Sequence, residues 1–278
     1  MDLSVIIVSW NVKEKLKANL QALFQSESDF IFEVLVVDNA SNDGSAEMVA
    51  AEFPQVKLIA NSQNLGFAKA NNQAISLSQG NHILLLNPDM RVQSDTLKLM
   101  MAWMEKNHQA TVSGCRLVDE RGTTVKQIRR FPSWKDQLFV ISKLPHIFPG
   151  LLNSYLLPDF DYNQASRVDS IRGAFFWINV SNFKKLSGQD KPFLDERYFI
   201  WFEEVDFCRQ VYQLGGEVWY TPVATCLDYV GQSFKQVKRG QAQKYFRDSM
   251  LAYFKKWGKN HEVKILSAAW KLTGLFIR

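Results

Sequence analysis

Cysteine is scarce in this chain, and no two cysteines stand close together. The 278 residues include Cys115, Cys208 and Cys226, and no C-x-x-C pair. Small secreted domains depend on many paired cysteines, and cysteine-based zinc sites need closely spaced ligands. The sequence therefore excludes a disulfide framework and a zinc site of that kind, and it favours a reducing, cytoplasmic compartment.

Long apolar runs are missing as well. No stretch reaches the roughly 18 uninterrupted apolar residues of a membrane-spanning helix. Residues 1–9 lead directly into a strand-like run without a basic segment, which is not typical of a secretory signal peptide. With 46% hydrophobic residues, the chain can still bury a large core. We expect a folded cytoplasmic protein with no membrane span.

A glycine-rich phosphate-binding loop is the third absence. Dinucleotide-binding domains carry G-x-G-x-x-G after their first strand. At that place this chain reads Ser9-Trp10-Asn11. The difference argues against a nicotinamide or flavin dehydrogenase and against a sugar nucleotidyltransferase.

Short apolar segments alternate with helix-like segments through the first 120 residues. The pattern predicts strands at residues 4–8, 33–37, 56–60 and 82–86, each followed by a helix. We expect Asn11 to cap the first of these helices. Uniformly apolar strands in this order predict a Rossmann-like, doubly wound and mainly parallel α/β sheet. After them, residues 131–170 are rich in proline and loop-like, and they fit either substrate-facing loops or irregular packing over the sheet.

Three carboxylates stand inside an aromatic and aliphatic run at residues 199–208. They are Glu203, Glu204 and Asp206. Acids in such a setting are costly unless they bind metal, pair with charge or move protons. Adjacent helical residues diverge by about 100°, so the two glutamates need different roles. We assign Glu204 as the general base and leave Glu203 and Asp206 to hold the loop, neighbouring cations or substrate hydroxyls. The alternative is an acid-rich helix N-terminus.

Two further acids follow predicted strands, at the sheet edge where open α/β proteins bind their ligands. Asp38 can accept hydrogen bonds from a nucleoside base or ribose, with Trp10 as an aromatic neighbour. Asp89 follows Pro88, and a single carboxylate can hold Mg²⁺ together with phosphate oxygens. Turn or helix-cap roles are the alternatives for both acids. Together these acids predict a metal-assisted nucleotide enzyme.

Positive charge is concentrated at the C-terminal end of the chain. Residues 235–278 hold 11 Lys and Arg against 2 Asp and Glu, interleaved with aromatic and aliphatic side chains. This basic amphipathic helical appendage is suited to an anionic membrane surface. A nucleic-acid patch would look similar, and so would a helix that packs on the domain and turns its lysines to water.

In this order the motifs resemble those of the inverting family 2 glycosyltransferases with the GT-A fold, in particular their rhamnosyltransferase-like branch. The resemblance covers about residues 3–260. The matching segments are Val8-Ser9-Trp10-Asn11, Val37-Asp38-Asn39-Ala40-Ser41-Asn42-Asp43-Gly44-Ser45, Asn64-Leu65-Gly66-Phe67-Ala68 with Asn72, Leu86-Asn87-Pro88-Asp89, Gly173-Ala174, Asp195-Glu196-Arg197-Tyr198-Phe199 and Phe202-Glu203-Glu204-Val205-Asp206-Phe207-Cys208.

The resemblance implies a catalytic domain at residues 1–234, with its nucleotide-binding half at 1–118 and its acceptor-binding half at 119–234. It implies Glu204 as the catalytic base and Glu203, Asp206, Gly173 and Ala174 as acceptor or loop support. The implied nucleotide-sugar-binding residues are Ser9, Trp10, Asn11, Asp38, Asn64, Gly66, Phe67, Asn72 and Asn87.

The implied cofactor is Mg²⁺ or Mn²⁺, held by Asp89 and Asp228. The sequence departs from the family at both ligands. Asn87 takes the first place of the usual D-x-D element, and Asp228 stands where the family often carries histidine in H-x-x-G-x-S. Carboxylate oxygen still suits a hard cation. A third departure is the stretch at residues 187–192, which is longer than the usual turn before Phe193.

The implied activity is transfer of a sugar, with L-rhamnose as the branch-level expectation, from a dTDP- or UDP-sugar to a hydroxyl of a glycan. We expect a lipid-linked acceptor, a role in cell-surface polysaccharide synthesis, no nucleic-acid partner and peripheral contact with the inner face of the cytoplasmic membrane. Two rivals remain. An inactive sugar-nucleotide sensor or glycan-binding module would keep the Asp38 pocket, and a metal-dependent nucleotidyltransferase would release pyrophosphate from a nucleoside triphosphate.

Overall fold

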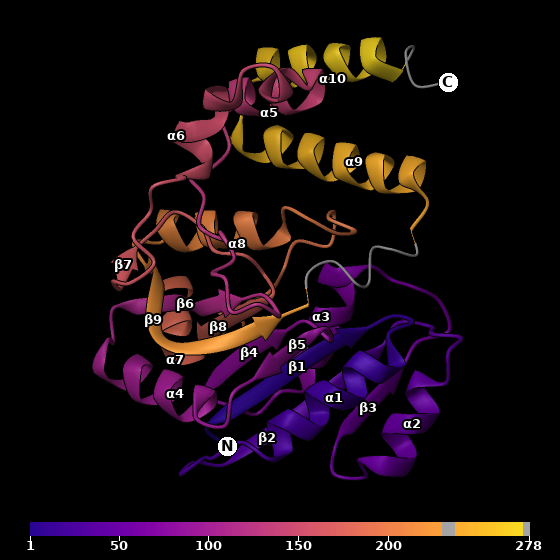
Figure 1. The fold of residues 1–278 in the computed structure, drawn as a ribbon, viewed down its shortest axis with the longest axis vertical. Coiled ribbons are helices and arrows are strands. Elements are labelled where there is room, and N and C mark those ends of the chain that lie inside the picture. Colours follow the sequence, from indigo (N-terminus) through magenta and orange to yellow (C-terminus); the bar gives the residue numbers. More distant parts are fainter. Residues whose placement is uncertain (230–236, 275–278) are drawn as a thin grey trace.

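The computed structural model describes residues 1–229 and 237–274, and its elements alternate as the sequence predicts (Figure 1). The strands are β1 (Leu3–Ser9), β2 (Phe32–Asp38), β3 (Lys57–Ala60), β4 (His82–Leu86), β5 (Met90–Val92), β6 (Ala110–Val118), β7 (Ser166–Arg167), β8 (Phe175–Asn179) and β9 (Glu217–Asp228). The helices are α1 (Lys13–Phe24), α2 (Ser45–Glu52), α3 (Phe67–Leu77), α4 (Thr96–Lys106), α5 (Trp134–Ser142), α6 (Asn153–Leu156), α7 (Val180–Ser187), α8 (Glu203–Gln213), α9 (Arg239–Trp257) and α10 (Asn260–Gly274), with short 3₁₀ turns η1 (Leu144–His146) and η2 (Pro149–Leu152).

All strands of the described residues belong to one sheet. Its order is β3-β2-β1-β4-β8-β6-β9-β5, and the short strand β7 pairs with β9. Neighbouring strands from β3 to β4 are parallel, as are β6 and β9, while β8, β5 and β7 run against their neighbours. The prediction of a mainly parallel α/β sheet is therefore confirmed.

Helices cover both faces of this sheet, because side chains along each strand alternate between the faces. Val5 and Ile7 of β1 pack with helices α1, α2 and α4, whereas Ile6 belongs to the core under α3, α7 and α8. Both cores consist of fully buried aliphatic and aromatic side chains. This arrangement is the doubly wound architecture that the sequence predicts.

The C-terminal helices lie beyond α8, at the end of the molecule that α5 shares (Figure 1). Met250, Tyr253 and Phe254 of α9 and Leu266 of α10 form a third apolar core with Tyr198 and other residues from before position 235. The predicted C-terminal helices are thus present, and they pack against the preceding part of the chain. Within the described ranges, no helix is both long enough and apolar enough to cross a membrane.

One local prediction is wrong. Val12, not Asn11, occupies the N-cap position of α1, and the first N–H of that helix, on Lys13, donates to the Asp43 side chain at 2.8 Å. Asn11 has a φ of 52° and its side-chain oxygen accepts a hydrogen bond from the Asn42 N–H at 2.7 Å. The Asn11 side chain therefore joins two loops and does not cap α1, although the local sequence pattern predicted that it would.

Candidate active site

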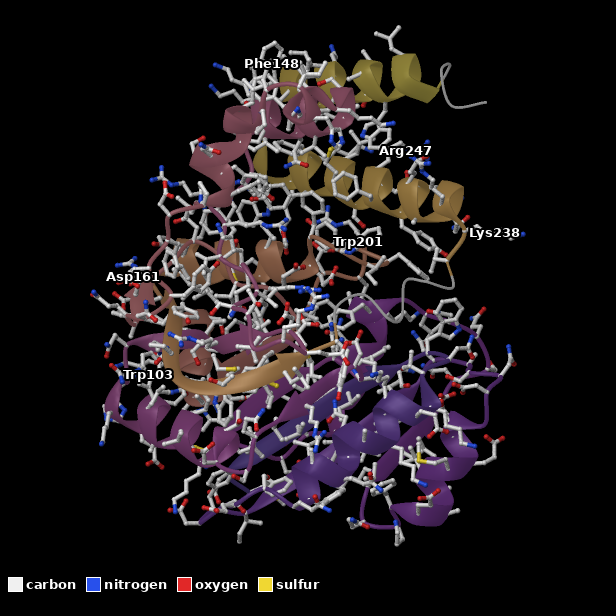
Figure 2. The ribbon with its side chains drawn as sticks, viewed as in Figure 1. Trp103, Phe148, Asp161, Trp201, Lys238 and Arg247 are labelled. Atoms are coloured by element: carbon white, nitrogen blue, oxygen red, sulfur yellow. The ribbon has the colours of Figure 1, made fainter. Side chains whose placement is uncertain are left out.

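A cavity of about 470 Å³ opens where the loops after β1, β2 and β4 meet. Five of the predicted nucleotide-sugar-binding residues line it, and on the far side Phe199 stacks on Tyr245 of α9 with ring centroids 4.2 Å apart. The five residues are Trp10, Asn64, Gly66, Phe67 and Asn87. Lys238, labelled in Figure 2 near the start of α9, also lines the cavity.

Ser9 and Asp38 end neighbouring parallel strands and lie directly opposite one another. Both are buried, at 0% and 2% exposure, and Asn39, the next residue, lines the cavity. Asp38 Oδ2 accepts a hydrogen bond from the Ser41 N–H at 3.0 Å. Asp38 Oδ1 and Ser9 Oγ have no hydrogen-bond partner among the described residues. Buried polar atoms rarely lack a partner, and these two lie next to the cavity without being among the residues that line it.

The loop around Gly66 packs closely against the backbone of Phe199. Gly66 has a φ of 83°, and a Cβ built on it would lie 2.5 Å from the Phe199 carbonyl oxygen. The neighbouring Phe67 N–H donates to that same oxygen at 2.7 Å. Asn39 holds the loop from the other side by donating to Asn64 Oδ1 and to the Gly66 carbonyl. Only glycine fits here, because both the φ and the space exclude a side chain.

Asn72 does not line this cavity. Its side chain accepts from the Leu194 N–H and donates to the Leu194 carbonyl and to Glu196. Asn72 therefore holds residues 194–196 in position. Asn11 also lies outside the residues that line the cavity, and its side chain joins two loops.

Glu203 and Glu204 form the start of α8, as the first helical turn. The two preceding residues, Trp201 and Phe202, both have a left-handed backbone, with φ of 64° and 71°. Bulky residues rarely adopt this conformation, and such strain is concentrated at functional sites. Figure 2 labels Trp201 between α9 and the sheet.

The two glutamates are held in surroundings that disfavour their charge. Burial raises the pKa of Glu204, and the positive charges of Arg129 and Arg172 offset part of that rise. The pKa of Glu203 is raised well above its usual value, first by burial and then by the neighbouring Glu204 carboxylate. The Oε2 atoms of both residues are buried and have no hydrogen-bond partner among the described residues. A carboxyl group with a raised pKa is suited to accepting a proton near neutral pH.

Two adjoining cavities share Glu204, Arg129, Tyr155 and Trp201 in their walls. The one of about 380 Å³ is polar and cationic, because Lys126 and Arg172 line it as well. The other, of about 280 Å³, is walled mainly by apolar side chains from α5, η2, α6, α8 and α9. These are Val140, Leu152, Leu156, Phe202, Val205 and Phe246.

Sequence reasoning missed Arg129 and Arg172 in these cavities, and it left Tyr155 open between a substrate-facing role and a packing role. Arg172 carried a usable signal, because it is a charged residue directly before the Gly173-Ala174 motif and in an otherwise apolar stretch. Arg129 and Tyr155 lie in the irregular region 119–170, where no motif marks them.

Three consecutive residues connect the nucleotide side of the site to Glu204. Arg172 Nη1 is 2.7 Å from Asp228 Oδ2. A Cβ on Gly173 would lie 3.4 Å from the Glu204 Cβ, so the helix start packs directly on this glycine. The Ala174 carbonyl accepts a hydrogen bond from the Asn87 N–H at 2.9 Å. Residues 172–174 therefore bring segments near positions 87, 204 and 228 together at one place.

Asp89 and Asp228 lie on adjoining backbones at this place. The Tyr229 N–H donates to the Asp89 carbonyl at 3.2 Å, and Met90 pairs with Asp228. Both acids are nearly buried, at 5% and 2% exposure. The described residues contain no group of three or more His, Cys, Asp and Glu side chains arranged around a metal position. One or two carboxylates still suffice for Mg²⁺ or Mn²⁺ when phosphate oxygens complete the shell, so the residues fit a cation that arrives with its nucleotide. Residues 230–233 of the predicted metal segment lie outside the described residues.

Asp206 faces away from these cavities and joins α8 to α9. Its carboxylate accepts hydrogen bonds from Tyr198 at 3.1 Å, Gln210 at 2.6 Å, Lys256 at 2.8 Å and Trp257 at 2.6 Å. Asp206 is fully buried, so these donors replace the water that it loses. Asp206 therefore joins the loop before α8, through Tyr198, to α9, through Lys256 and Trp257.

The fold and this site belong to a defined class. Residues 4–160 match the model of the glycosyl transferase family 2, and this chain is a member of that family. The predicted family is thereby confirmed.

Among curated proteins, rhamnosyltransferase WbbL of Escherichia coli K12 is 24% identical over 81% of this chain and 82% of its own length. An N-acetylglucosaminyl-diphospho-decaprenol L-rhamnosyltransferase of Mycobacterium tuberculosis is 23% identical over 72% of this chain and 67% of its own.

Among solved structures, the mannosyltransferase PcManGT of Pyrobaculum calidifontis, in complex with GDP-Man and Mn²⁺, superposes with a TM-score of 0.58 at 16% identity. The match covers 96% of this chain and 68% of that one. It shows that the two proteins share the GT-A fold, which confirms the fold prediction.

Proposed function

We propose that this protein is an inverting, metal-dependent glycosyltransferase that moves a sugar from a nucleoside diphosphate to a hydroxyl group of a glycan. The observation that carries the proposal is the convergence at residues 172–174. That short segment contacts Asn87 beside the nucleotide cavity, Asp228 beside the metal position and Glu204 at the proposed base. Donor and acceptor would therefore meet within one site.

The donor in this proposal occupies the 470 Å³ cavity. Asp38 and Ser9 offer buried oxygens to the base or ribose, Trp10 offers an aromatic face, and Asn64, Gly66, Phe67 and Asn87 shape the walls. The sugar in this proposal is carried on dTDP or UDP, and the two curated rhamnosyltransferases support L-rhamnose as the first candidate for it. A Mg²⁺ or Mn²⁺ ion, when bound by Asp89 and Asp228, neutralises charge on the diphosphate. PcManGT, which contains Mn²⁺, supports this cofactor.

Glu204 performs the proton step. An acceptor hydroxyl attacks the anomeric carbon, a new C–O bond forms, and the bond to the diphosphate oxygen breaks on the opposite face. The hydroxyl proton passes to the Glu204 carboxylate, and the nucleoside diphosphate leaves with the bonding electrons. A single displacement of this kind inverts the anomeric configuration. Gly173 and Ala174 set the distance between donor and base.

The acceptor is a lipid-linked glycan in this proposal, on its way to a cell-surface polysaccharide. The cationic cavity with Lys126, Arg129 and Arg172 suits phosphate groups, and the adjoining apolar cavity suits hydrocarbon. Such an acceptor would be met at the cytoplasmic face of a membrane. The three cysteines, all unpaired and buried, are compatible with a reducing compartment.

The alternative functions differ in what the protein would release. An inactive sensor would bind the nucleotide sugar and turn nothing over, but it has no need for Glu203 and Glu204 to keep buried, unpartnered oxygens. A nucleotidyltransferase would release pyrophosphate. Analysis of the released nucleotide separates all three.

Glu204→Gln tests the proposal. The substitution keeps the size and removes the base, so we expect transfer to fall about 10²–10⁴-fold, the usual contribution of general-base catalysis. Affinity for the nucleoside diphosphate should remain within about threefold of the wild type, as measured by calorimetry. Proton NMR of the sugar product should show inversion at the anomeric carbon in the wild-type reaction.

Glu203→Gln is the matched control, because it removes the neighbouring carboxylate from the same helical turn. It should retain far more activity than Glu204→Gln. Undiminished turnover in Glu204→Gln, or a product with retained configuration, contradicts the proposed mechanism.

A further inference from the structure

Residues 142–150 expose large apolar side chains at one end of the molecule. Ile147 is 70% exposed and Phe148 is 59% exposed, on the turn between η1 and η2. Figure 2 labels Phe148 at the end of the molecule formed by α5 and α10. The segment contains Lys143 and His146 and no acidic residue. An exposed aromatic and aliphatic pair in a segment that contains a lysine and no acid is unusual on a surface that faces water.

Helix α10 exposes a similar face at the same end. Ile265 and Leu272 are 37% and 61% exposed, and they stand seven residues apart, which places them on one side of the helix. Lys264 and Lys271 are exposed beside them. The helix's acid, Glu262, is half-buried and accepts a hydrogen bond from the Lys259 N–H at 2.8 Å, so it belongs to the helix start.

Helix α5 contacts both of these exposed segments and fixes them to the rest of the protein. The chain continues from α5 directly into η1 and η2, and α5 also packs against α10. Leu266 of α10 is fully buried in the core that includes Ile141 of α5. Both exposed segments therefore lie at the same end of the molecule (Figure 2), which we call the η1–α10 end and define by Lys143, His146, Ile147, Phe148, Lys264, Ile265, Lys271 and Leu272.

We propose that the η1–α10 end docks on an anionic lipid bilayer, with Ile147 and Phe148 inserted at the headgroup boundary and the lysines against lipid phosphates. Charge complementarity selects this occupant. A second copy would bring the same cationic residues against themselves, whereas an anionic bilayer matches both the charge and the apolar side chains. The proposal narrows the membrane contact predicted for residues 235–278 and adds the segment before α6, which lies outside that region.

The docking has a consequence for the acceptor, and this one step depends on the proposed function. Leu152 and Leu156, which wall the apolar cavity beside Glu204, follow Phe148 by four and eight residues. A bilayer at the η1–α10 end would therefore lie close to the cavity proposed for acceptor hydrocarbon.

Vesicle sedimentation tests the docking with the full chain. We expect the wild type to bind vesicles that contain phosphatidylglycerol and to bind phosphatidylcholine vesicles at least tenfold more weakly. Ile147→Ser combined with Phe148→Ser should reduce binding to the anionic vesicles at least tenfold. Ile31→Ser is the matched control, because Ile31 is 67% exposed but lies just before β2, and it should bind as the wild type does.

Charge reversal tests the electrostatic part. Lys264→Glu combined with Lys271→Glu should abolish the preference for anionic vesicles, whereas Lys98→Glu with Lys106→Glu on α4 should retain it. Wild-type behaviour of either η1–α10 variant, or no binding by the wild type, overturns the proposal. Self-association that the same substitutions abolish, detected by light scattering, would assign the surface to a second copy instead. Nucleotide-induced thermal stabilisation should be unchanged in every variant, so failure of the docking is distinguishable from failure of the proposed function.

Discussion

Gly66 shows how one residue fixes the nucleotide cavity. Its left-handed backbone and its contact with the Phe199 carbonyl bring the loop before α3 against the segment before α8, although the two are more than 130 residues apart. The wall of the cavity depends on this approach, because both Gly66 and Phe199 line it.

Gly66→Ala should therefore lower the free energy of unfolding by about 2–4 kcal/mol, since a Cβ adds backbone strain and a clash at 2.5 Å. Urea unfolding measures the loss. Gly188→Ala is the control: Gly188 has a φ of 72° but open space around its Cβ position, so we expect a loss of about 1–2 kcal/mol from strain alone. Equal losses would mean that the contact with Phe199 contributes nothing.

Glu203 should make stability depend on pH. Burial raises its pKa in the folded protein above the usual 4.5, so the stability linked to its proton is complete below about pH 4.5 and is lost as the pH rises through the folded pKa. Glu203→Gln removes this loss. We expect the variant to exceed the wild type by about 1–3 kcal/mol at pH 8, with a smaller difference at pH 4.5.

Thermal unfolding across this pH range checks the Glu203 prediction. Glu27→Gln, at an exposed position, is the control and should follow the wild-type curve. A Glu203→Gln curve parallel to that of the wild type would show that Glu203 is ionised in the folded protein without penalty.

At the level of single residues, the sequence predicted which side chains gather at the strand ends, wherever a motif follows a strand. Trp10, Asn64, Gly66 and Asn87 line the cavity because strand ends in a parallel sheet meet at one edge. Arg129 could not be predicted, and the role of Tyr155 could not be decided, since their segment has no regular period that would place them. The prediction that Asn11 caps a helix is wrong because its side chain binds the backbone of Asn42, 31 residues away.

Among the elements, α9 connects the C-terminal helices to the catalytic part of the chain. Lys256 of α9 is 2.8 Å from the buried Asp206 carboxylate and 3.0 Å from Asp195. Amphipathic patterning predicted a basic helix here, but it could not show which lysine turns inward, because that depends on an acid 50 residues earlier in the chain.

Lys256→Met should lower the free energy of unfolding by about 3–5 kcal/mol, because it leaves a buried carboxylate without its cation. Lys255→Met is the control, since Lys255 is exposed on the same turn, and it should change stability by less than about 0.5 kcal/mol. Chemical denaturation compares the two. A small effect of Lys256→Met would mean that Tyr198, Gln210 and Trp257 satisfy Asp206 without the lysine.

For the whole molecule, the order of strands and helices was predictable because uniformly apolar strands and amphipathic helices alternate in the sequence. The antiparallel insertion of β8 between β4 and β6 was not, since no local pattern records which strands become neighbours. That insertion is nevertheless what brings residues 172–174 to the site, because they lead into β8.

Ligand binding should stabilise the whole fold. A nucleoside diphosphate at 100 times its dissociation constant adds about 2.7 kcal/mol, which corresponds to a rise in Tm of about 5 °C. We expect the best of UDP, dTDP and GDP to give this shift, and Mn²⁺ or Mg²⁺ to increase it. Asp89→Asn should lose the increment due to metal, whereas the exposed Asp159→Asn should keep it. A metal-independent shift in the wild type would remove Asp89 from cation binding.

The segment at residues 172–174 has a further consequence for how this enzyme can change. Its three residues contact three different partners in succession, so a shift of the segment by one position would break all three contacts. In the proposed mechanism, that shift would misalign the leaving group and the proton acceptor together. On the proposed function, changes in the irregular region 119–170 should alter acceptor preference, whereas an insertion or deletion next to Gly173 should abolish turnover. A different acceptor selectivity should therefore be sought by exchanging loops in the region 119–170 while the length of the segment around residues 172–174 is kept constant.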